Sequence, residues 1–192
     1  ELINDSTPSK ELFFYKKGIE EFIEEKSKSI IKLVDRNFFI NYKINQNEFF
    51  ETIISFNNNE KSFFKSYCNT IETPDGGSHE NAIKNGIIKA IKLYGGKNQF
   101  GKISNINLND IIDYSNILIS IFINEPSFEG QTKKRVVMPK LQKILEEIVE
   151  NEFLKWLNSN KNIANKLTET FIERSLLRTD LYKSKELERK TI

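Results

Sequence analysis

The residues best suited to chemistry in this sequence form a short basic stretch that begins at Gly130. Gly130 permits an unusual backbone conformation, Gln131 offers a donor and an acceptor, Thr132 offers a hydroxyl, and Lys133 carries a mobile ammonium. Residues 131–143 contain basic residues and no acidic residue. A loop of this kind between a buried strand and a helix suits a polyphosphate. The alternative is an ordinary solvated basic loop, which the spacing alone favours.

A second candidate is the turn that contains His79 and Glu80. A histidine beside a glutamate is a pair that can serve in acid–base catalysis. However, no serine or cysteine nucleophile accompanies this pair in an interpretable motif. A histidine in the first turn of a helix more often stabilises the turn than takes part in chemistry. We therefore interpret His79 as structural.

The third candidate is the charged stretch of residues 173–190, in which basic residues outnumber acidic ones. One interpretation is a strut lining a cavity for DNA, where basic side chains contact phosphates without reading the base sequence. The mixed signs favour a simpler interpretation, a solvated connecting helix. Any contact with DNA is expected to be weak and sensitive to salt.

Composition limits the classes of protein that this chain can represent. Its 192 residues suffice for one α/β domain with a helical extension, and its net charge of +2 does not by itself indicate a nucleic-acid-binding protein. The single Cys68 excludes an internal disulfide, and with the single His79 it argues against a catalytic zinc centre. No run of about 18 apolar residues is present, so we expect no membrane partner. Because the chain starts without methionine and ends in a charged stretch, we expect an internal piece of a larger cytosolic protein.

Hydrophobic periodicity predicts the elements that position these candidates. Strands are predicted at residues 13–15, 30–34, 38–44, 49–56, 63–69 and 117–123. The predicted helices are a short one from Gly18, a long one capped by Ser78 and ended by Gly95 and Gly96, a short one at 107–114 capped by Asn107, and two after the basic loop. The second of these two begins near Asn160, and its apolar stripe thins after Leu177. We therefore expect its end to leave the globular body.

Three segments, at residues 13–19, 66–80 and 125–133, resemble motifs of bacterial type IIA DNA topoisomerase ATPase subunits. Residues 66–80 resemble the family's Asn-x-Ile…Asp-Gly-Gly-Thr-His signature, with Ser78 in place of the usual threonine. Residues 125–133 resemble its Pro-x-Phe-x-x-Gln-Thr-Lys loop, and residues 13–19 resemble its Phe-x-Tyr-x-Gly-Gly-Ile entry, with Lys17 where a glycine is usual. The motifs stand in the family's order and at its spacing. The resemblance covers roughly residues 11–190.

Details of the motifs look more like the B subunit of topoisomerase IV than the B subunit of gyrase. The sequence Tyr-Cys-Asn-Thr-Ile at residues 67–71 stands where gyrase more often has Asn-Asn-Ile. Residues 112–114 read Ile-Asp-Tyr where Arg-Glu-Gly is common in gyrase. The same domain of the gyrase B subunit is the nearest alternative. A non-enzymatic nucleic-acid-binding module with the same fold is the alternative from another class.

The resemblance implies a fold and a division of the chain. The fold is α/β (α+β), a ribosomal protein S5 domain 2-like transducer fold with a mixed β-sheet, helices on one side and a long C-terminal helix. Residues 1–10 would lead in from a nucleotide-binding domain, and residues 11–160 would form the transducer domain. Residues 161–192 would form a helix leading to a metal-binding TOPRIM domain.

The resemblance also implies a function for the basic loop. Gln131 and Lys133, with Thr132 between them, would bind the γ-phosphate of ATP in the nucleotide site of the neighbouring domain. A lysine at the γ-phosphate stabilises transition-state charge and distinguishes ATP from ADP. Hydrolysis removes its partner, so the loop can release and the domain can rotate.

The full protein would then be an ATP-hydrolysing type II DNA topoisomerase, an isomerase that uses ATP and Mg2+. Its partners would be its own nucleotide-binding and TOPRIM domains, the A subunit of topoisomerase IV in a heterotetramer, and double-stranded DNA in the bacterial cytoplasm, at the nucleoid. The chain has no adenine-binding aspartate, magnesium-binding Asn-Glu helix or cleavage tyrosine of the family. We therefore expect no cofactor in this chain alone, and neither ATP hydrolysis nor DNA cleavage by it.

Overall fold

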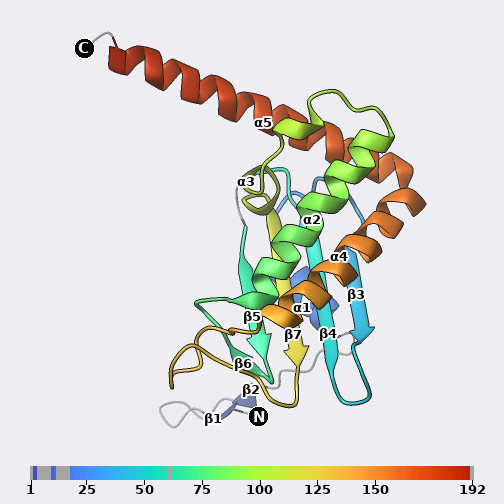
Figure 1. The fold of residues 1–192 in the computed structure, drawn as a ribbon, viewed down its shortest axis with the longest axis vertical. Coiled ribbons are helices and arrows are strands. Elements are labelled where there is room, and N and C mark those ends of the chain that lie inside the picture. The colour runs from blue at the N-terminus through green and yellow to red at the C-terminus, as the bar shows by residue number, and fades with distance from the viewer. Residues whose placement is uncertain (1, 4–9, 12–17, 60–61, 191–192) are drawn as a thin grey trace.

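The computed structural model describes residues 2–3, 10–11, 18–59 and 62–190 (Figure 1). The central element is a five-stranded sheet with the strand order β3-β4-β7-β5-β6. Its strands are β3 (Phe38–Lys43), β4 (Phe49–Phe56), β5 (Phe64–Cys68), β6 (Ile71–Glu72) and β7 (Ser115–Phe122). The neighbouring strands are antiparallel except β5 and β7, which are parallel. A separate antiparallel pair joins β1 (Leu2–Ile3) to β2 (Lys10–Glu11).

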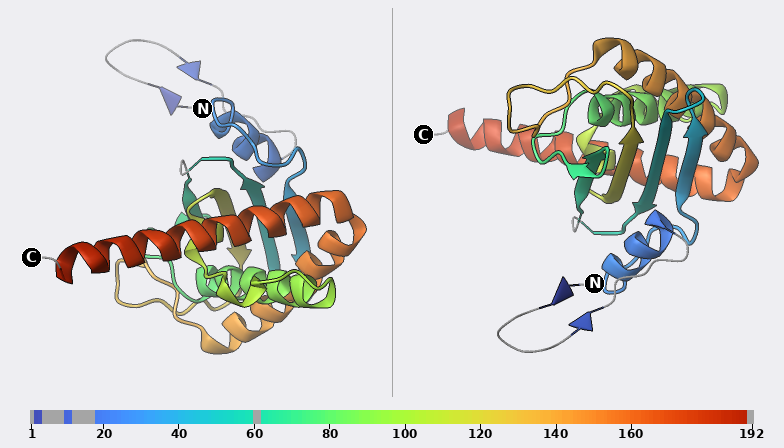
Figure 2. Two further views of the ribbon diagram at one scale, coloured as in Figure 1. Left: turned by 90° about the horizontal axis from the view of Figure 1, so that it is seen from above. Right: turned by 90° about the horizontal axis from the view of Figure 1, so that it is seen from below.

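Two long helices, α2 (Ser78–Lys97) and α4 (Pro139–Ser159), lie side by side over one face of the sheet (Figures 1 and 2). Alternation along the strands supplies the core beneath them, because every second side chain of a strand points to the same face. Phe50, Ile54 and Phe56 of β4 are fully or almost fully buried on this face. The apolar stripe of α2 meets them, and all of its members are buried: Ile83, Ile87, Ala90, Ile91 and Tyr94. The expected mixed α/β fold is thus confirmed.

The opposite face of the sheet is partly covered by the short helix α1 (Ile19–Lys26). Ile23 of α1 is fully buried and packs with Ile53 and Leu118 from the sheet. The helix confirms the prediction of a short helix after Gly18. The residues under α1 form a small second core on this face, separate from the main core under α2 and α4 on the opposite face.

The last helix, α5 (Lys161–Lys190), crosses the end of the sheet at which β7 begins, and its far end projects from the body (Figure 1). Its first half belongs to the main core, since Ala164, Leu167 and Phe171 are fully buried. Further along, Leu177 and Leu181 are 65% and 63% exposed. The expectation that the end of this helix leaves the globular body is therefore confirmed, although the buried stripe ends before Leu177 and not after it.

Two arginines fasten α5 to the body. The Arg174 guanidinium lies 3.5 Å from the centre of the Tyr114 ring and donates to the Asn57 carbonyl oxygen at 2.9 Å. Arg178 donates to both carboxylate oxygens of Asp110, at 2.9 and 3.1 Å. Asp110 belongs to the short helix α3 (Asn109–Ile112), which ends just before β7. The helix is thus held by a partly buried ion pair and a cation–π contact at one end of the sheet.

Several boundaries predicted from the sequence need correction. Residues 30–34 form no strand, only an isolated bridge between Lys32 and Asn57, because the neighbours Leu33 and Val34 are both buried and do not alternate. The long helix runs through Gly95 and Gly96 to Lys97 before it ends. The strand predicted at residues 13–15 lies outside the described residues. The N-cap of α3 is Leu108, without a side-chain bond, but the Asn107 side chain does accept the Asp110 N–H while Asp110 accepts the Asn107 N–H.

We predict opposite effects for two glycines of α2. A Cβ at Gly86 would lie 2.7 Å from the Val149 side chain on α4, whereas a Cβ at Gly96 would meet nothing within 4 Å. Overpacking costs about 1–3 kcal/mol and outweighs the gain in helix propensity of up to about 1 kcal/mol. Gly86→Ala should therefore lower the free energy of unfolding by about 1–2 kcal/mol, and Gly96→Ala should leave it equal or slightly higher. Denaturant unfolding measures both, and equal effects would contradict the packing described for α2 and α4.

Candidate functional site

The predicted basic loop is a short hairpin between β7 and α4. Its two arms run antiparallel, with the Glu129 N–H donating to the Arg135 carbonyl at 2.9 Å and the Val137 N–H donating to the Ser127 carbonyl at 2.8 Å. The tip consists of residues 130–134. Gly130 and Lys133 both adopt positive φ there, +76° and +55°. The glycine thus supplies the left-handed turn for which it was singled out.

The hairpin is bound to the turn formed by Asp75, Gly76, Gly77 and Ser78. Val136 pairs with this turn on both sides: its N–H donates to the Gly76 carbonyl at 3.0 Å, and its carbonyl accepts the Ser78 N–H at 2.9 Å. The Asp75 N–H donates to the Lys134 carbonyl at 3.1 Å. Two motifs that are far apart in the sequence therefore form one backbone-paired unit.

Gly77 is required at this crossing for a steric reason. Its φ is +129°, and a Cβ on it would lie 2.1 Å from the Val136 carbonyl oxygen. Neighbouring backbone leaves no room for any side chain, because the clash is with main-chain atoms and not with a flexible side chain. The Gly-Gly pair thus allows the hairpin to approach the start of α2.

Side chains fix both ends of the loop. Where the chain leaves β7, the Asn69 amide donates to the Ile123 carbonyl and accepts the Ile123 N–H, each at 2.8 Å. Where α4 begins, the Ser78 hydroxyl accepts the Met138 N–H at 2.8 Å. The prediction that Ser78 caps α2 is therefore wrong: Gly77 is the N-cap, without a side-chain bond, and the Ser78 hydroxyl bonds to a distant backbone group.

His79 is buried and serves the structure of the turn. Its Nε2 atom lies 3.1 Å from the Thr73 hydroxyl, which in turn donates to the Ser66 carbonyl at 3.0 Å. Burial, and then the positive charge of Lys84, lowers the pKa of His79 to about 4. Glu80 accepts a hydrogen bond from the Ser66 hydroxyl at 2.7 Å. A neutral, fully buried imidazole of this kind favours the structural interpretation over acid–base catalysis.

The tip side chains differ from those of the stem. Arg135, in the stem, forms an ion pair with Glu129 at 3.2 Å. Gln131, Thr132 and Lys133 are exposed and have no side-chain hydrogen bond or ion pair with the described part of the chain. The tip thus exposes an amide, a hydroxyl and an ammonium, while the stem below it is hydrogen-bonded to the turn of residues 75–78.

The donor set of the tip fits phosphate oxygens rather than a metal ion. Amide, hydroxyl and ammonium groups donate hydrogen bonds to phosphate, whereas Mg2+ prefers carboxylate and water oxygens. Among the described residues, no group of three or more His, Cys, Asp or Glu side chains is placed to hold a metal. A nucleotide bound at this tip would therefore need its base, sugar and metal to be held by other residues.

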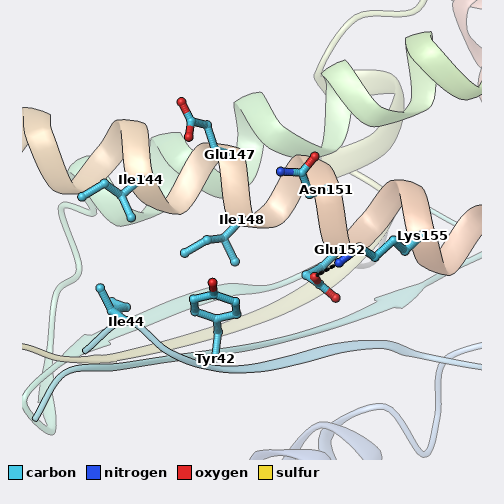
Figure 3. A pocket seen from close by; sticks show the side chains of 8 residues that line it. All are labelled: Tyr42, Ile44, Ile144, Glu147, Ile148, Asn151, Glu152 and Lys155. Carbon is cyan, nitrogen blue, oxygen red and sulfur yellow. Dashed lines mark hydrogen bonds and ion pairs between the residues drawn. The ribbon is translucent and has the colours of Figure 1, made fainter. Parts of the chain in front are cut away.

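A hollow between the end of β3 and α4 does not form a second candidate (Figure 3). Tyr42 and Ile148 face each other across it, while Glu147 points away from the Tyr42 ring. Lys155 is paired with Glu152 at 2.6 Å. Ile144 of α4 is 46% exposed at this hollow. The polar groups do not converge on one point, so we assign the hollow no chemistry.

The charged stretch at the C-terminus is partly used inside the fold. Arg174 is only 8% exposed, and Arg178 is bound to Asp110. These two arginines are therefore structural and are not available for the proposed contacts with DNA phosphates. Side chains of residues 185–190 lie outside the described part. No helix within the described ranges combines the length and apolarity needed to cross a bilayer.

Comparison with known proteins shows the family to which the chain belongs. The family profile described as DNA gyrase B matches residues 18–187. The B subunit of DNA topoisomerase 4 from Rickettsia bellii is 34% identical over 189 residues, covering 97% of this chain and 28% of that protein. The B subunit of DNA gyrase from Halalkalibacterium halodurans is 29% identical over 180 residues, covering 93% of this chain and 28% of that protein.

Solved structures of domains from topoisomerase IV and gyrase B have the same fold as this chain. The topoisomerase IV ATP-binding domain of Francisella tularensis, in complex with a small-molecule inhibitor, superposes with a TM-score of 0.78 at 27% identity, covering 92% of this chain and 48% of that one. The 43K ATPase domain of Thermus thermophilus gyrase B, in complex with an aminocoumarin, gives 0.80 at 22% identity, covering 94% and 49%, and supports the fold alone.

The fold and the paired motifs define the class as the B subunits of type II DNA topoisomerases, as the sequence resemblance predicted. Within this class, the chain belongs to the DNA gyrase B family. It spans about 28% of the length of the curated relatives described above.

The buried His79 predicts a dependence of stability on pH. Its folded pKa of about 4 lies below the usual 6.5, so the unfolded state binds the proton more tightly. The contribution of His79 to the free energy of unfolding is fully present above about pH 6.5 and is lost as the pH falls toward 4. Between pH 7 and 5 the native chain should lose about 1–2 kcal/mol more unfolding free energy than His79→Gln. Equal pH slopes by denaturant unfolding would refute the assignment of a neutral, buried imidazole.

Two glycine substitutions test the crossing of turn and hairpin. Gly77→Ala should lower the free energy of unfolding by about 3 kcal/mol or more, because the Cβ would collide with the Val136 backbone. Gly130→Ala also replaces a glycine of positive φ but meets nothing within 4 Å, so it should cost only about 1 kcal/mol of backbone strain. Thermal or denaturant unfolding compares the pair. A Gly77→Ala cost no larger than that of Gly130→Ala would contradict the close approach.

Proposed function

We propose that this chain is the transducer domain in the B subunit, which carries the ATPase, of a type II DNA topoisomerase of the topoisomerase IV kind. In this role it couples ATP binding and hydrolysis to DNA strand passage, decatenation and relaxation. The observation that carries the proposal is the braced hairpin whose free tip side chains are Gln131, Thr132 and Lys133. Membership of the DNA gyrase B family supplies the context.

In this proposal, Gln131 and Lys133 bind the γ-phosphate of ATP in the nucleotide site of a neighbouring domain. The Lys133 ammonium offsets negative charge that develops on the phosphoryl oxygens, and the Gln131 amide donates to one of them. ATP and Mg2+ are held by that other domain. ADP offers no γ-phosphate to these groups, so the tip distinguishes the nucleotide before hydrolysis from the one after it.

Movement of the tip would be transmitted to α2 and α4, because the stem of the hairpin is hydrogen-bonded to the start of α2 and continues directly into α4. Val136 joins the hairpin to the start of α2, and Met138 joins it to the start of α4. These two helices pack against each other along the sheet, whose far end is clasped to α5 by Arg174 and Arg178. Engagement or release of the γ-phosphate would therefore turn the sheet, the helices and α5 together.

The proposal includes the division of the chain and its partners. Residues 1–10 lead in from the nucleotide-binding domain, 11–160 form the transducer, and residues 161–192, which contain α5, lead to the TOPRIM domain. The assembled enzyme contains the A subunit of topoisomerase IV and acts on double-stranded DNA in the bacterial cytoplasm, at the nucleoid. The exposed Leu177 and Leu181 on α5 suit a helix that meets a further domain.

The same domain of the DNA gyrase B subunit is the second candidate. The 29% identity to the gyrase protein of Halalkalibacterium halodurans favours it. The 34% identity to the Rickettsia bellii topoisomerase 4 protein, over 97% of the chain, favours the first. Family membership favours either of them over a non-enzymatic nucleic-acid-binding module. Reconstitution with each type of A subunit separates the two, since only the matching pair should show ATP-dependent strand passage.

Replacement of Lys133 tests the proposed role directly. In the full-length protein, assembled with its A subunit, Lys133→Ala should lower ATP turnover and decatenation by about a hundredfold or more, as loss of a transition-state charge partner does. Lys102→Ala is a matched control, because Lys102 is also exposed and also has positive φ, but lies beyond the far end of α2. Unchanged turnover in Lys133→Ala would refute the role. ATP turnover by the isolated 192-residue chain, abolished by Lys133→Ala, would refute its dependence on a second domain.

A further inference from the structure

We propose that Asn69 and Ser78 are positioning residues, which hold the two ends of the hairpin so that Lys133 reaches the γ-phosphate. This inference rests on the function proposed for Lys133. Neither residue touches the nucleotide in this account. Each acts through the backbone of the loop, one where the chain leaves the sheet and the other where it enters α4.

Asn69 fixes the exit from β7. Its backbone continues the parallel pairing of β5, with its N–H donating to the Ile121 carbonyl at 2.8 Å. It then turns away with φ of +49°, a conformation that asparagine tolerates better than most residues. Beyond the end of β5, the Asn69 side chain makes with Ile123 the two hydrogen bonds that a neighbouring strand backbone would otherwise make. The start of the loop is therefore held at Ile123 by this amide, while the Glu48 carboxylate accepts the N–H of the next residue, Asn124, at 3.2 Å.

Ser78 fixes the entry into α4. Its N–H donates to the Val136 carbonyl while its hydroxyl accepts the Met138 N–H at 2.8 Å. Met138 is the N-cap of α4, so the first turn of α2 is tied to the first turn of α4. The hydroxyl is almost fully enclosed, since Ser78 is only 6% exposed. The Ser78 hydroxyl thus fixes the position of Met138, at which the returning arm of the hairpin joins α4, relative to the start of α2.

The two anchors matter for position more than for folding. Packing of α2 on α4 does not depend on them, because the helices meet at Gly86 and Val149 and are bridged by Asn85 and Glu146. Loss of either bond should leave these contacts in place and loosen the hairpin. Displacement of a reacting group by about 1 Å is enough to lower a rate by as much as a hundredfold. The effect should therefore appear in the phosphate contact before it appears in stability.

The test measures two affinities of the full-length protein, one for a non-hydrolysable ATP analogue and one for ADP. Their ratio reports the γ-phosphate contact, which a general loss of structure would not change selectively. The variants are Ser78→Ala, Ser78→Thr, which keeps the hydroxyl, and Asn69→Asp, which loses the amide donor. The controls are Ser159→Ala and Asn41→Asp, at exposed positions on α4 and β3 away from the loop. Lys133→Ala is measured in parallel.

We expect Ser78→Ala and Asn69→Asp to lower the ATP-analogue to ADP affinity ratio about fivefold, in keeping with the loss of a hydrogen bond. Affinity for ADP should be unchanged, Ser78→Thr should restore the ratio, and the two controls should match the native protein. The positioning role is overturned if Lys133→Ala lowers the ratio while both anchor variants keep it. If Lys133→Ala also keeps the ratio, the proposed function fails and the positioning role fails with it. Thermal unfolding identifies a variant that loses its fold, and Asn69→Asp then decides in place of Ser78→Ala.

Discussion

The pairing of Val136 with the turn at Gly76 and Ser78 is the interaction on which the rest of this structure depends. Two backbone hydrogen bonds bring the hairpin against the start of α2, and only glycine fits at position 77 because the Val136 carbonyl occupies the place of a Cβ. This contact determines where the returning arm lies. Together with the bonds of Asn69 to Ile123 and of Ser78 to Met138, it positions the tip and the start of α4. A motif that looks like a simple turn in the sequence is in fact the support of the loop.

Charged groups divide into those used inside the fold and those left free. Arg174 and Arg178 satisfy Asn57 and Asp110 at one end of β7, where an unpaired buried charge would be costly. At the other end of β7, Asn69 holds Ile123, and the loop that follows presents Lys133 without a partner in the described part of the chain. The same strand thus joins the clasp of α5 to the origin of the loop. This arrangement suits a domain that converts engagement of a phosphate at one end into movement of a helix at the other.

Much of the fold follows from local rules. The stripe of α2 and the apolar run of β7 identify their elements because their periods are those of a buried helix and a buried strand. The roles of Asn69 and Ser78 do not follow, since their bonds reach backbone groups 54 and 60 residues away. The sequence predicts Ser78 as a cap because a serine at the start of a helix usually bonds to the first turn, but here the Met138 N–H, far along the chain, takes its hydroxyl. Gly130 and Lys133 could be singled out from the sequence, but composition gave them no preference over a solvated loop.

We propose that the tip of this hairpin works in the nucleotide site of another domain. The most direct measurement is a structure of the full-length protein with a non-hydrolysable ATP analogue and Mg2+. We expect the Lys133 ammonium and the Gln131 amide at about 3 Å from γ-phosphate oxygens, with the pairing of Val136 to Gly76 and Ser78 retained. A tip that lies in solvent away from the γ-phosphate, or that reaches it only after the stem has separated from the turn, would contradict the account.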